Sequence, residues 1–261
     1  MILNSTAENE TVLPSAILPV AVVIGATGLV GRQLIHQLLN SGRYREVYAV
    51  VRKPFDLNET DIIKKSLTWI EIPDFAQLKS VLQKYDFKDA DAFSTLGSTL
   101  KQAGSKAAFY QIDHDYNLAF AEVTQQQGAR HFLLVSAMGA HVDSLVYYNR
   151  VKGGLEQDVQ HLNFEYCSIF RPSLLLGERQ DARLLEGAAQ SFFQWGQSLL
   201  PKTFYARPIT AQQVATVMAH VALLKWKDAS QEQSEKAVYS PEQAASSHVE
   251  FYSNKMMLSM A

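Results

Sequence analysis

Three glycines recur at every third position of one short segment, as Gly25, Gly28 and Gly31. The β-branched run before them, residues 20–24, predicts a buried strand, and the apolar residues after them recur at helical spacing. At such a junction the first glycine allows a sharp turn, the second lets the backbone approach a pyrophosphate, and the third lets the helix pack closely on the strand. The first N–H groups of the helix would face the phosphates. The segment therefore predicts nucleotide binding; a turn that needs glycine for its geometry alone is the alternative.

The residues after the predicted second strand indicate which nucleotide binds. An NAD site usually has an acidic residue there, which accepts a hydrogen bond from the ribose 2′-OH. In this chain the strand over residues 47–51 is followed by Arg52 and Lys53. Two cations suit a 2′-phosphate, because a guanidinium pairs with phosphate and also stacks on adenine. The pair favours NADP(H) over NAD(H), and a solvated basic turn is the alternative.

Two further positions fit the same nucleotide. Asp74 follows the predicted third strand, where its carboxylate would accept a hydrogen bond from the adenine amino group. Leu96 and Gly97 follow the fourth strand, where the backbone would pass close to the nicotinamide ribose. Ordinary turn chemistry explains each of these positions equally well.

Tyr148 and Lys152 are four residues apart, so a helix over residues 146–161 would place the phenol and the ammonium on one face. A neighbouring lysine cation, together with the positive charge of an oxidised nicotinamide, would stabilise the phenolate and lower the pKa of Tyr148 below its ordinary value of about 10. The phenol would exchange a proton with a substrate oxygen while a hydride moves to or from the nucleotide. The lysine would also hold the ribose hydroxyls. An exposed pair of helix residues is the alternative.

Ser136, at the end of the predicted fifth strand, is the expected third catalytic residue. Its hydroxyl would bond to a substrate carbonyl or to the nicotinamide, whereas a serine that only closes a strand is the alternative. Asp113 and Asp115 lie in a predicted helix, and we expect them on its solvated face rather than in the site. The seven histidines show no metal-ligand spacing, so we expect no metal site.

Short β-branched runs alternate with longer stretches of helical period along the chain. We predict strands at residues 20–24, 47–51, 67–72, 90–96, 131–136 and 166–170. Helices are predicted at residues 30–41, 75–82, 107–127, 146–161, 184–199 and 211–224. The alternation predicts an α/β fold, a doubly wound parallel-sheet Rossmann domain with a small C-terminal helical region that shapes the substrate cleft.

The composition is that of an ordinary soluble globular protein, with 47% hydrophobic and 19% charged residues among 261. A net charge of −2 argues against a general attraction to nucleic acid or to an anionic membrane. The single cysteine, Cys167, cannot form an internal disulfide, which suits a reducing compartment, and we expect a cytoplasmic protein. We expect a flexible extension over residues 1–19, the Rossmann domain with its cap over 20–245, and a flexible tail over 246–261.

From about residue 20 to about residue 220, the chain resembles the atypical short-chain dehydrogenase/reductases, in the branch of the mammalian Tat-interacting protein of 30 kDa and its bacterial relatives. The resemblance rests on the segments GATGLVGR, VVRKP, PDFAQL, STLGST, IDHDYN, HFLLVSAMGA, YYNRVKG and IFRPSLLLGERQDAR. It implies an NADPH-binding Rossmann fold in which Tyr148 is the proton donor and Lys152 its partner. It also implies cofactor contacts at Thr27, Gly28, Leu29, Val30, Arg52, Lys53, Leu96, Gly97, Leu175 and Arg183.

One residue departs from the family pattern. Relatives often have a second serine, frequently the catalytic one, where this chain has Ala137. The leading hypothesis is an NADPH-dependent oxidoreductase that acts on a small carbonyl-type molecule. A non-catalytic NADP(H)-sensing protein that acts through a protein partner is the second, and a nucleotide-sugar epimerase or dehydratase is the third. The substrate stays unnamed, and both a homodimer and a regulatory protein partner remain open.

Overall fold

The computed structural model describes residues 18–54, 66–176, 207–236 and 248–261, with side chains for all of these except 227–236. Its centre is a sheet of seven parallel strands in the order β3-β2-β1-β4-β5-β6-β9. The strands are β1 (Val20–Ile24), β2 (Glu46–Val51), β3 (Leu67–Glu71), β4 (Asp91–Ser94), β5 (His131–Val135), β6 (Tyr166–Arg171) and β9 (His248–Ser253).

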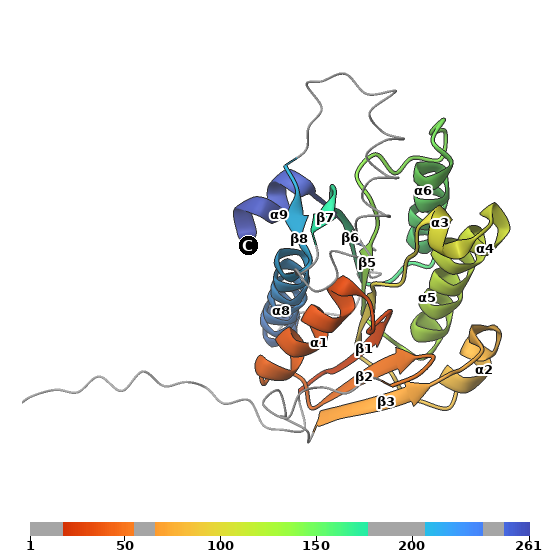
Figure 1. Cartoon of the computed structure of the whole chain (residues 1–261). Helices are drawn as coiled ribbons and strands as arrows, with labels where there is room; N and C mark the ends of the chain where they lie inside the picture. Colours follow the sequence, from red (N-terminus) through yellow and green to blue (C-terminus); the bar gives the residue numbers. More distant parts are fainter. Residues whose placement is uncertain (1–17, 55–65, 177–206, 237–247) are drawn as a thin grey trace, which may run out of the picture.

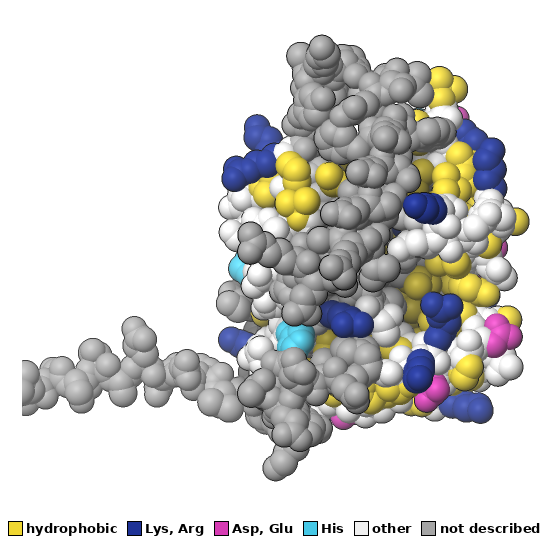
Figure 2. Space-filling model, in the orientation of Figure 1, with side chains coloured by type: hydrophobic (Ala, Val, Ile, Leu, Met, Phe, Trp, Pro, Cys, Tyr) yellow, Lys and Arg dark blue, Asp and Glu magenta, His cyan; other side chains and the backbone are white. Residues whose placement is uncertain are grey.

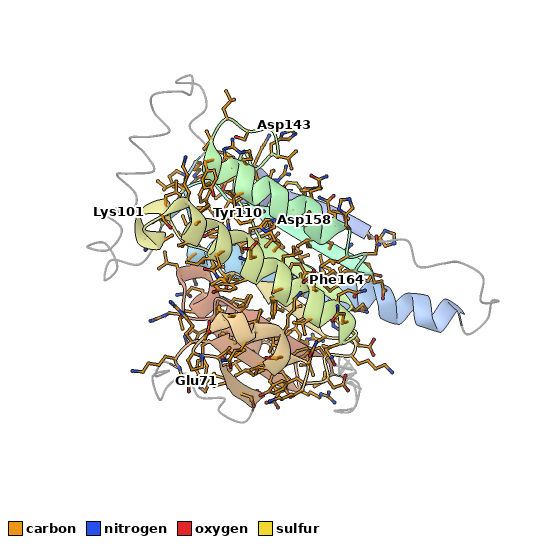
Figure 3. The ribbon with its side chains drawn as sticks, turned by 90° about the vertical axis from the view of Figure 1, so that its right-hand side faces the viewer. Glu71, Lys101, Tyr110, Asp143, Asp158 and Phe164 are labelled. Carbon is orange, nitrogen blue, oxygen red and sulfur yellow. The ribbon has the colours of Figure 1, made fainter. Side chains whose placement is uncertain are left out.

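Helices cover both faces of this sheet (Figure 1). α1 (Leu29–Asn40) and α8 (Ala211–Lys236) pack together on one face, and α2 (Leu78–Leu82), α5 (Tyr116–Gln126) and α6 (Tyr147–Gln160) lie on the other, which Figure 3 turns toward the viewer. The shorter elements are η4 (Phe75–Gln77), α3 (Leu100–Ala103), α4 (Lys106–Tyr110), η5 (Gln111–Asp115), β7 (Leu175–Leu176), β8 (Ile209–Thr210) and α9 (Asn254–Met260). The arrangement confirms the predicted doubly wound α/β Rossmann fold.

The strand order reverses at β1, which pairs with β2 on one side and with β4 on the other. In a doubly wound sheet, this reversal opens a ligand crevice outside the carboxyl ends of the strands. The glycine loop follows β1 and the Leu96-Gly97 segment follows β4, so both lie at this crevice.

The helix predicted over residues 107–127 consists of three successive elements, α4, the π-helical η5 and α5. The buried Asn117 side chain holds the π turn in place. Its amide nitrogen donates to the Ile112 carbonyl at 2.9 Å, and its amide oxygen accepts a hydrogen bond from the Ser94 hydroxyl. Such turns are frequent at functional sites. Here the turn directs Asp113 into the interior of the protein, where the side chain is fully buried.

The prediction of a tail without structure after residue 246 is wrong. β9 pairs in parallel with β6 as the seventh strand, and α9 follows it. The Tyr252 ring stacks on Phe170 with 4.8 Å between centroids, and Met257 is fully buried. β9 has no strong apolar pattern because it is an edge strand, and only Tyr252 among its six residues is buried.

The other strands begin and end within two residues of their predicted bounds. α8 continues past the predicted end at residue 224. The predicted helix at 184–199 and most of the predicted N-terminal extension fall outside the described residues. Within the described part of the chain, no helix is both long and apolar enough to cross a membrane. Figure 2 shows Lys and Arg side chains dispersed over the described surface of one face rather than gathered in one patch.

A buried acid lies at the opposite edge of the sheet, where the strands begin. Asp91, the first residue of β4, is fully buried, and its Oδ2 accepts a hydrogen bond from the Tyr44 hydroxyl at 2.7 Å. Burial raises the pKa of Asp91 to about 7, although the bond from Tyr44 and the charge of Arg130 act to lower it. The folded protein therefore keeps this proton at pH values at which the unfolded chain has lost it.

We predict that Asp91 makes the protein less stable as the pH rises from about 4 to about 7. The folded state binds the extra proton in this window, so the free energy of unfolding falls by up to about 4 kcal/mol and levels off above the folded pKa. Urea unfolding of the wild type and Asp91→Asn at several pH values measures the difference between the two slopes. Identical slopes for the two proteins would contradict the prediction.

Candidate functional site

Two glycines at the junction of β1 and α1 leave no space for a side chain. Gly25 has a φ of +78°, and a Cβ atom on it would lie 2.5 Å from the backbone nitrogen of Leu96. A Cβ atom on Gly31 would lie 2.2 Å from the carbonyl oxygen of Gly25. Gly25 thus lets the loop pass directly beside the end of β4, and Gly31 lets α1 begin against the loop.

Gly28 is less crowded than the other two glycines, and its backbone angles do not require glycine. Its φ is −75°, and a Cβ atom on it would meet the Gly25 carbonyl oxygen in a tight contact at 3.2 Å. Among the described residues no side chain caps α1, and the first turn of α1 has no acidic residue. The first N–H groups of α1 thus have no side-chain partner, and the missing side chain leaves room for an anion.

The remaining residues of the glycine segment differ in how far their side chains are buried. Thr27 is exposed, Leu29 is half-buried and Val30 is buried, so Val30 can offer a phosphate only its backbone N–H. Arg32, which the sequence analysis did not single out, donates from Nε to the Thr27 carbonyl at 2.9 Å and so braces the loop. Its place one helical turn after Gly28 is the signal that could have identified it.

Arg52 and Lys53 follow β2 and are both exposed. β2 pairs with β1, so the two cations stand at the sheet edge that carries the glycine loop. Neither cation forms an ion pair with any other described residue. Asp74 caps η4, where its Oδ1 accepts a hydrogen bond from the Ala76 N–H at 2.9 Å, and this contact is the one that the turn interpretation predicts.

A buried ion pair lies at the same edge of the sheet. The Lys152 ammonium, on α6, is 2.8 Å from Oδ1 of Asp113, on η5, and the two residues are 3% and 0% exposed. The second carboxylate oxygen of Asp113 accepts hydrogen bonds from the Ser98 N–H at 2.8 Å and the Ser98 hydroxyl at 2.6 Å. The prediction that Asp113 lies on a solvated face is wrong, because the π turn of η5 directs it inward. Asp115, on the same element, keeps a half-exposed carboxylate.

Gly97 lies next to this ion pair. A Cβ atom on it would lie 3.2 Å from Oδ1 of Asp113 and 3.5 Å from Nζ of Lys152. Gly97 is exposed and Leu96 is half-buried. Because nothing larger than hydrogen projects from residue 97, a ligand that lies along this backbone can come close to the lysine.

In the protein without nucleotide, the pKa of Tyr148 lies above its ordinary value. Burial raises it, the charge of Lys152 lowers it and the charge of Asp113 raises it, and the net shift is upward. For Lys152, burial lowers the pKa, but Asp113 and Tyr148 raise it by more. Burial is the largest cause of the upward shift for Tyr148, and the charge of Asp113 adds to it. The lowered pKa expected beside an oxidised nicotinamide stays a prediction. In the protein alone, the phenol is neutral and the ammonium is charged.

Ser136 follows β5 and is 4% exposed. Its N–H donates to the Phe170 carbonyl at 2.8 Å, and its hydroxyl has no hydrogen-bond partner among the described residues. Ala137, in place of the second serine, is also buried and offers no hydroxyl. A buried hydroxyl without a partner is costly, so Ser136 is the residue that a ligand oxygen would satisfy at this position.

α6 is held close to the chain that leads into it. A Cβ atom on Gly153 would lie 2.3 Å from the carbonyl carbon of His141, so only glycine allows this contact. On the neighbouring turn of α6, the buried Glu156 accepts hydrogen bonds from the guanidinium of Arg171, with 2.9 Å between Oε1 and Nε. These contacts fix the helix that carries Tyr148 and Lys152.

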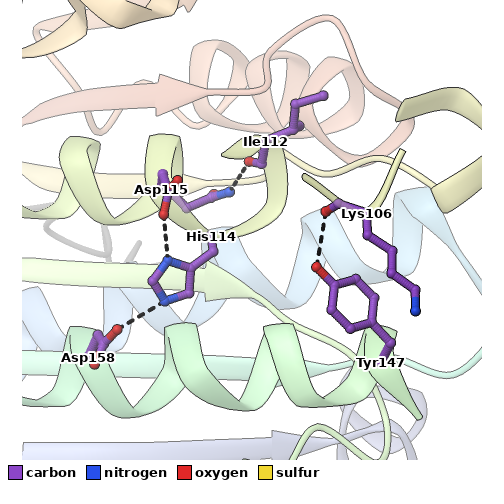
Figure 4. Close-up of polar contacts among 7 residues, drawn as sticks. Lys106, Ile112, His114, Asp115, Tyr147 and Asp158 are labelled. Carbon is purple, nitrogen blue, oxygen red and sulfur yellow. Dashed lines mark hydrogen bonds and ion pairs between the residues drawn. The ribbon is translucent and has the colours of Figure 1, made fainter. Parts of the chain in front are cut away.

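Further contacts join η5 and α4 to α6 (Figure 4). The His114 ring lies between two carboxylates, with Nδ1 3.0 Å from Asp115 and Nε2 2.9 Å from Asp158 of α6. The Tyr147 hydroxyl donates to the Lys106 carbonyl at 3.0 Å. The element that carries Asp113 is thereby tied to the helix that carries its lysine partner.

The last two predicted cofactor residues lie after β6. Leu175 is in β7, pairs with Ile209 of β8 and packs against the core on the α1 and α8 face. Arg183 lies outside the described residues. The structure thus brings Gly97, Asp113 and Lys152 together, and it places the glycine loop, Arg52 and Ser136 along the same edge of the sheet.

Comparison with known proteins fits this geometry. The sequence profile of a family described as NAD(P)H-binding matches residues 25–223. The chain belongs to this family. Protein FMP52, mitochondrial, of Debaryomyces hansenii is 35% identical over 205 residues, which cover 77% of this chain and 87% of that protein. Rat protein HTATIP2 is 33% identical, covering 66% of this chain and 69% of the relative, and it confirms the resemblance drawn from the sequence.

Solved structures show the same fold at low sequence identity. An oxidoreductase of the short-chain dehydrogenase/reductase family from Burkholderia thailandensis has a TM-score of 0.57 at 16% identity and covers 92% of this chain and 93% of its own. WbmH of Bordetella bronchiseptica, solved with NAD+, has a TM-score of 0.57 at 11% identity, with coverage of 90% and 86%. The prediction of a cytoplasmic protein is overturned, because the matching fungal FMP52 proteins are named as mitochondrial.

We predict that removing one charge of the Lys152–Asp113 ion pair lowers the free energy of unfolding more than removing both charges does. Lys152→Met leaves the buried Asp113 carboxylate without its counter-ion and should lower the free energy of unfolding by about 3–5 kcal/mol. Lys152→Met combined with Asp113→Asn removes both charges and should recover most of that loss. Urea unfolding of the wild type, both single variants and the double variant gives the coupling energy. Simple addition of the two single effects would contradict the prediction.

Proposed function

We propose that this protein is an NADP(H)-dependent oxidoreductase that transfers a hydride to a small carbonyl-type substrate, with Tyr148 as the proton donor. The observation that carries the proposal is the position of the Lys152 ammonium under Gly97, within 3.5 Å of the place where a Cβ atom would be. Tyr148 is one turn away on the same helix. The glycine loop lies at the same sheet edge, so a nucleotide with its phosphates on α1 would have its other end beside these two residues.

The residues at this edge fit a dinucleotide. Gly28 and the start of α1 suit a pyrophosphate, and Gly97 suits the close passage of a ribose. Arg52 and Lys53 support a 2′-phosphate and hence NADP(H), although the family description covers both nucleotides. The names of the fungal relatives support a mitochondrial location for this chain as well.

The chemistry follows from the groups present. A bound nicotinamide supplies the hydride. Ser136, whose buried hydroxyl has no partner in the described protein, would hold the substrate oxygen. Tyr148 would protonate that oxygen, and Lys152 would hold the ribose hydroxyls while staying charged.

A second candidate is a protein that binds NADP(H) without turnover and acts through a protein partner. Ala137 favours it, because the family often has a serine hydroxyl at this position. The epimerases among the structural neighbours, such as the UDP-glucose 4-epimerase of Thermotoga maritima at 17% identity, support the fold and no particular substrate.

We predict that Arg52→Ala weakens NADPH binding about tenfold or more and NADH binding much less, because only NADPH loses a contact to the 2′-phosphate while both lose the stacking on adenine. Titration followed by nucleotide fluorescence measures both constants. Arg45→Ala is the matched control, since Arg45 is equally exposed but precedes β2 at the opposite edge of the sheet. Equal losses for NADPH and NADH would contradict the role of Arg52, and no binding of either nucleotide would overturn the proposed function.

We predict that Tyr148→Phe lowers kcat for carbonyl reduction by about 10²–10⁴-fold and leaves the Kd for NADPH within a few-fold of wild type. A panel of aldehydes and ketones with NADPH oxidation as the readout provides the assay. Tyr147→Phe is the control, because that hydroxyl bonds to the Lys106 carbonyl. Undiminished turnover in Tyr148→Phe would remove Tyr148 from the mechanism. NADPH binding by a wild-type protein that reduces nothing in the panel would favour the second candidate.

A further inference from the structure

We propose that Asp113 is a positioning residue that commits this site to reduction: by pairing with Lys152 it keeps Tyr148 as a neutral phenol, ready to give its proton to a carbonyl oxygen. The inference rests on the proposed function, which leaves the direction of the reaction open. A catalyst does not move an equilibrium. It does set the protonation state of the resting site, and therefore the pH range in which each direction is fast.

The positive charge near Tyr148 has a buried counter-charge. Burial is the largest cause of the raised pKa of Tyr148, and among the described residues Lys152 is the cation that lowers it while Asp113 raises it. Two carboxylates act on that lysine, those of Asp113 and Glu156. Glu156 is already paired with the guanidinium of Arg171. Asp113 is therefore the counter-ion of Lys152, at 2.8 Å, and no uncompensated positive charge is left among these groups to stabilise a phenolate.

Asp113 cannot easily leave this position. Its Oδ2 accepts two hydrogen bonds from Ser98, and its Oδ1 faces the ammonium. The backbone of η5 is fixed by the bond from the Asn117 amide to the Ile112 carbonyl, and the neighbouring His114 ties η5 to α6. A carboxylate held at both oxygens on a fixed π turn stays beside the lysine.

The surroundings of Tyr148 also favour the neutral phenol. The Phe109 ring of α4 lies 5.5 Å from the Tyr148 ring, centroid to centroid, so this neighbour offers the phenol no charge. Ionisation would add a second anion next to Asp113 in a buried place, which is unfavourable. The upward shift of the Tyr148 pKa agrees with this geometry.

The proton count of the reaction then follows. The carbonyl carbon accepts a hydride, with its two electrons, from the reduced nucleotide, and the carbonyl oxygen accepts the proton from the Tyr148 hydroxyl. The C=O double bond becomes a C–O single bond with one new C–H and one new O–H bond, and the nucleotide is oxidised. Tyr148 is left as a phenolate, and solvent returns its proton. An amide at residue 113 would leave Lys152 uncompensated and so favour the phenolate, the form that oxidation of an alcohol needs.

The test is a tyrosinate titration of the nucleotide-free, full-length protein. Ultraviolet absorbance is followed from neutral to strongly alkaline pH, and subtraction of the matching Tyr148→Phe protein isolates the signal of Tyr148. In the wild type, Tyr148 should ionise later than a free tyrosine, whereas Asp113→Asn should bring its ionisation to lower pH by about one unit or more. Asp115→Asn, a neighbouring change on the same element, should leave the Tyr148 signal where it is.

A titration of Tyr148 that does not move in Asp113→Asn would overturn the proposal. Ionisation of Tyr148 in the wild type well below that of a free tyrosine would also overturn it, and this arm needs no variant to fold. Ring-carbon-labelled tyrosine followed by NMR gives the same wild-type value independently. The titration uses neither nucleotide nor substrate, so its outcome is independent of NADPH binding. A protein that fails to bind NADPH would contradict the proposed function without changing the result of the titration.

Discussion

The buried contact between Lys152 and Asp113 is the interaction on which the arrangement of this site depends. An ammonium and a carboxylate that are 3% and 0% exposed tolerate burial only as a pair, so the two elements that carry them must meet in one register. That requirement accounts for the π turn in η5, since a regular α-helix would place residue 113 on another face. It also favours glycine at residue 97, because a Cβ atom there would lie 3.2 Å from Oδ1 of Asp113.

The sheet places this contact where a nucleotide can reach it. β1 and β4 are neighbours at the point where the strand order reverses, and Gly25 lets the two following loops touch. The N-terminus of α1 and the Leu96-Gly97 segment beside the ion pair are consequently parts of one crevice, although they are about seventy residues apart in the chain. The bonds from Tyr147 and His114 then fix α6 against α4 and η5, so the phenol and the ammonium approach the crevice together.

The sequence was sufficient for the fold and for the parts of the site that have a local pattern. The glycine spacing, the basic pair after β2 and the Tyr-x-x-x-Lys helix are each readable within a few residues, and the parallel strands follow from their β-branched runs. Asp113 was misjudged because helical periodicity assumes 3.6 residues per turn, and a π turn changes which residues face inward. The raised pKa of Tyr148 in the protein alone could not be foreseen either, because it comes first from burial and then from the charge of that inward-facing aspartate.

The C-terminal strand was missed because an edge strand has no strong apolar pattern, and only Tyr252 of β9 is buried. Asn254, directly after β9, accepts a hydrogen bond from the Ser173 N–H at 3.0 Å and donates to the Arg207 carbonyl at 2.8 Å. Ser173 follows β6 and Arg207 precedes β8, so one buried amide ties the segment after β6 to the segment before β8. The family profile ends at residue 223, before this strand. Residues 248–261 are nevertheless part of the same domain, because they complete the sheet and hold these two segments together.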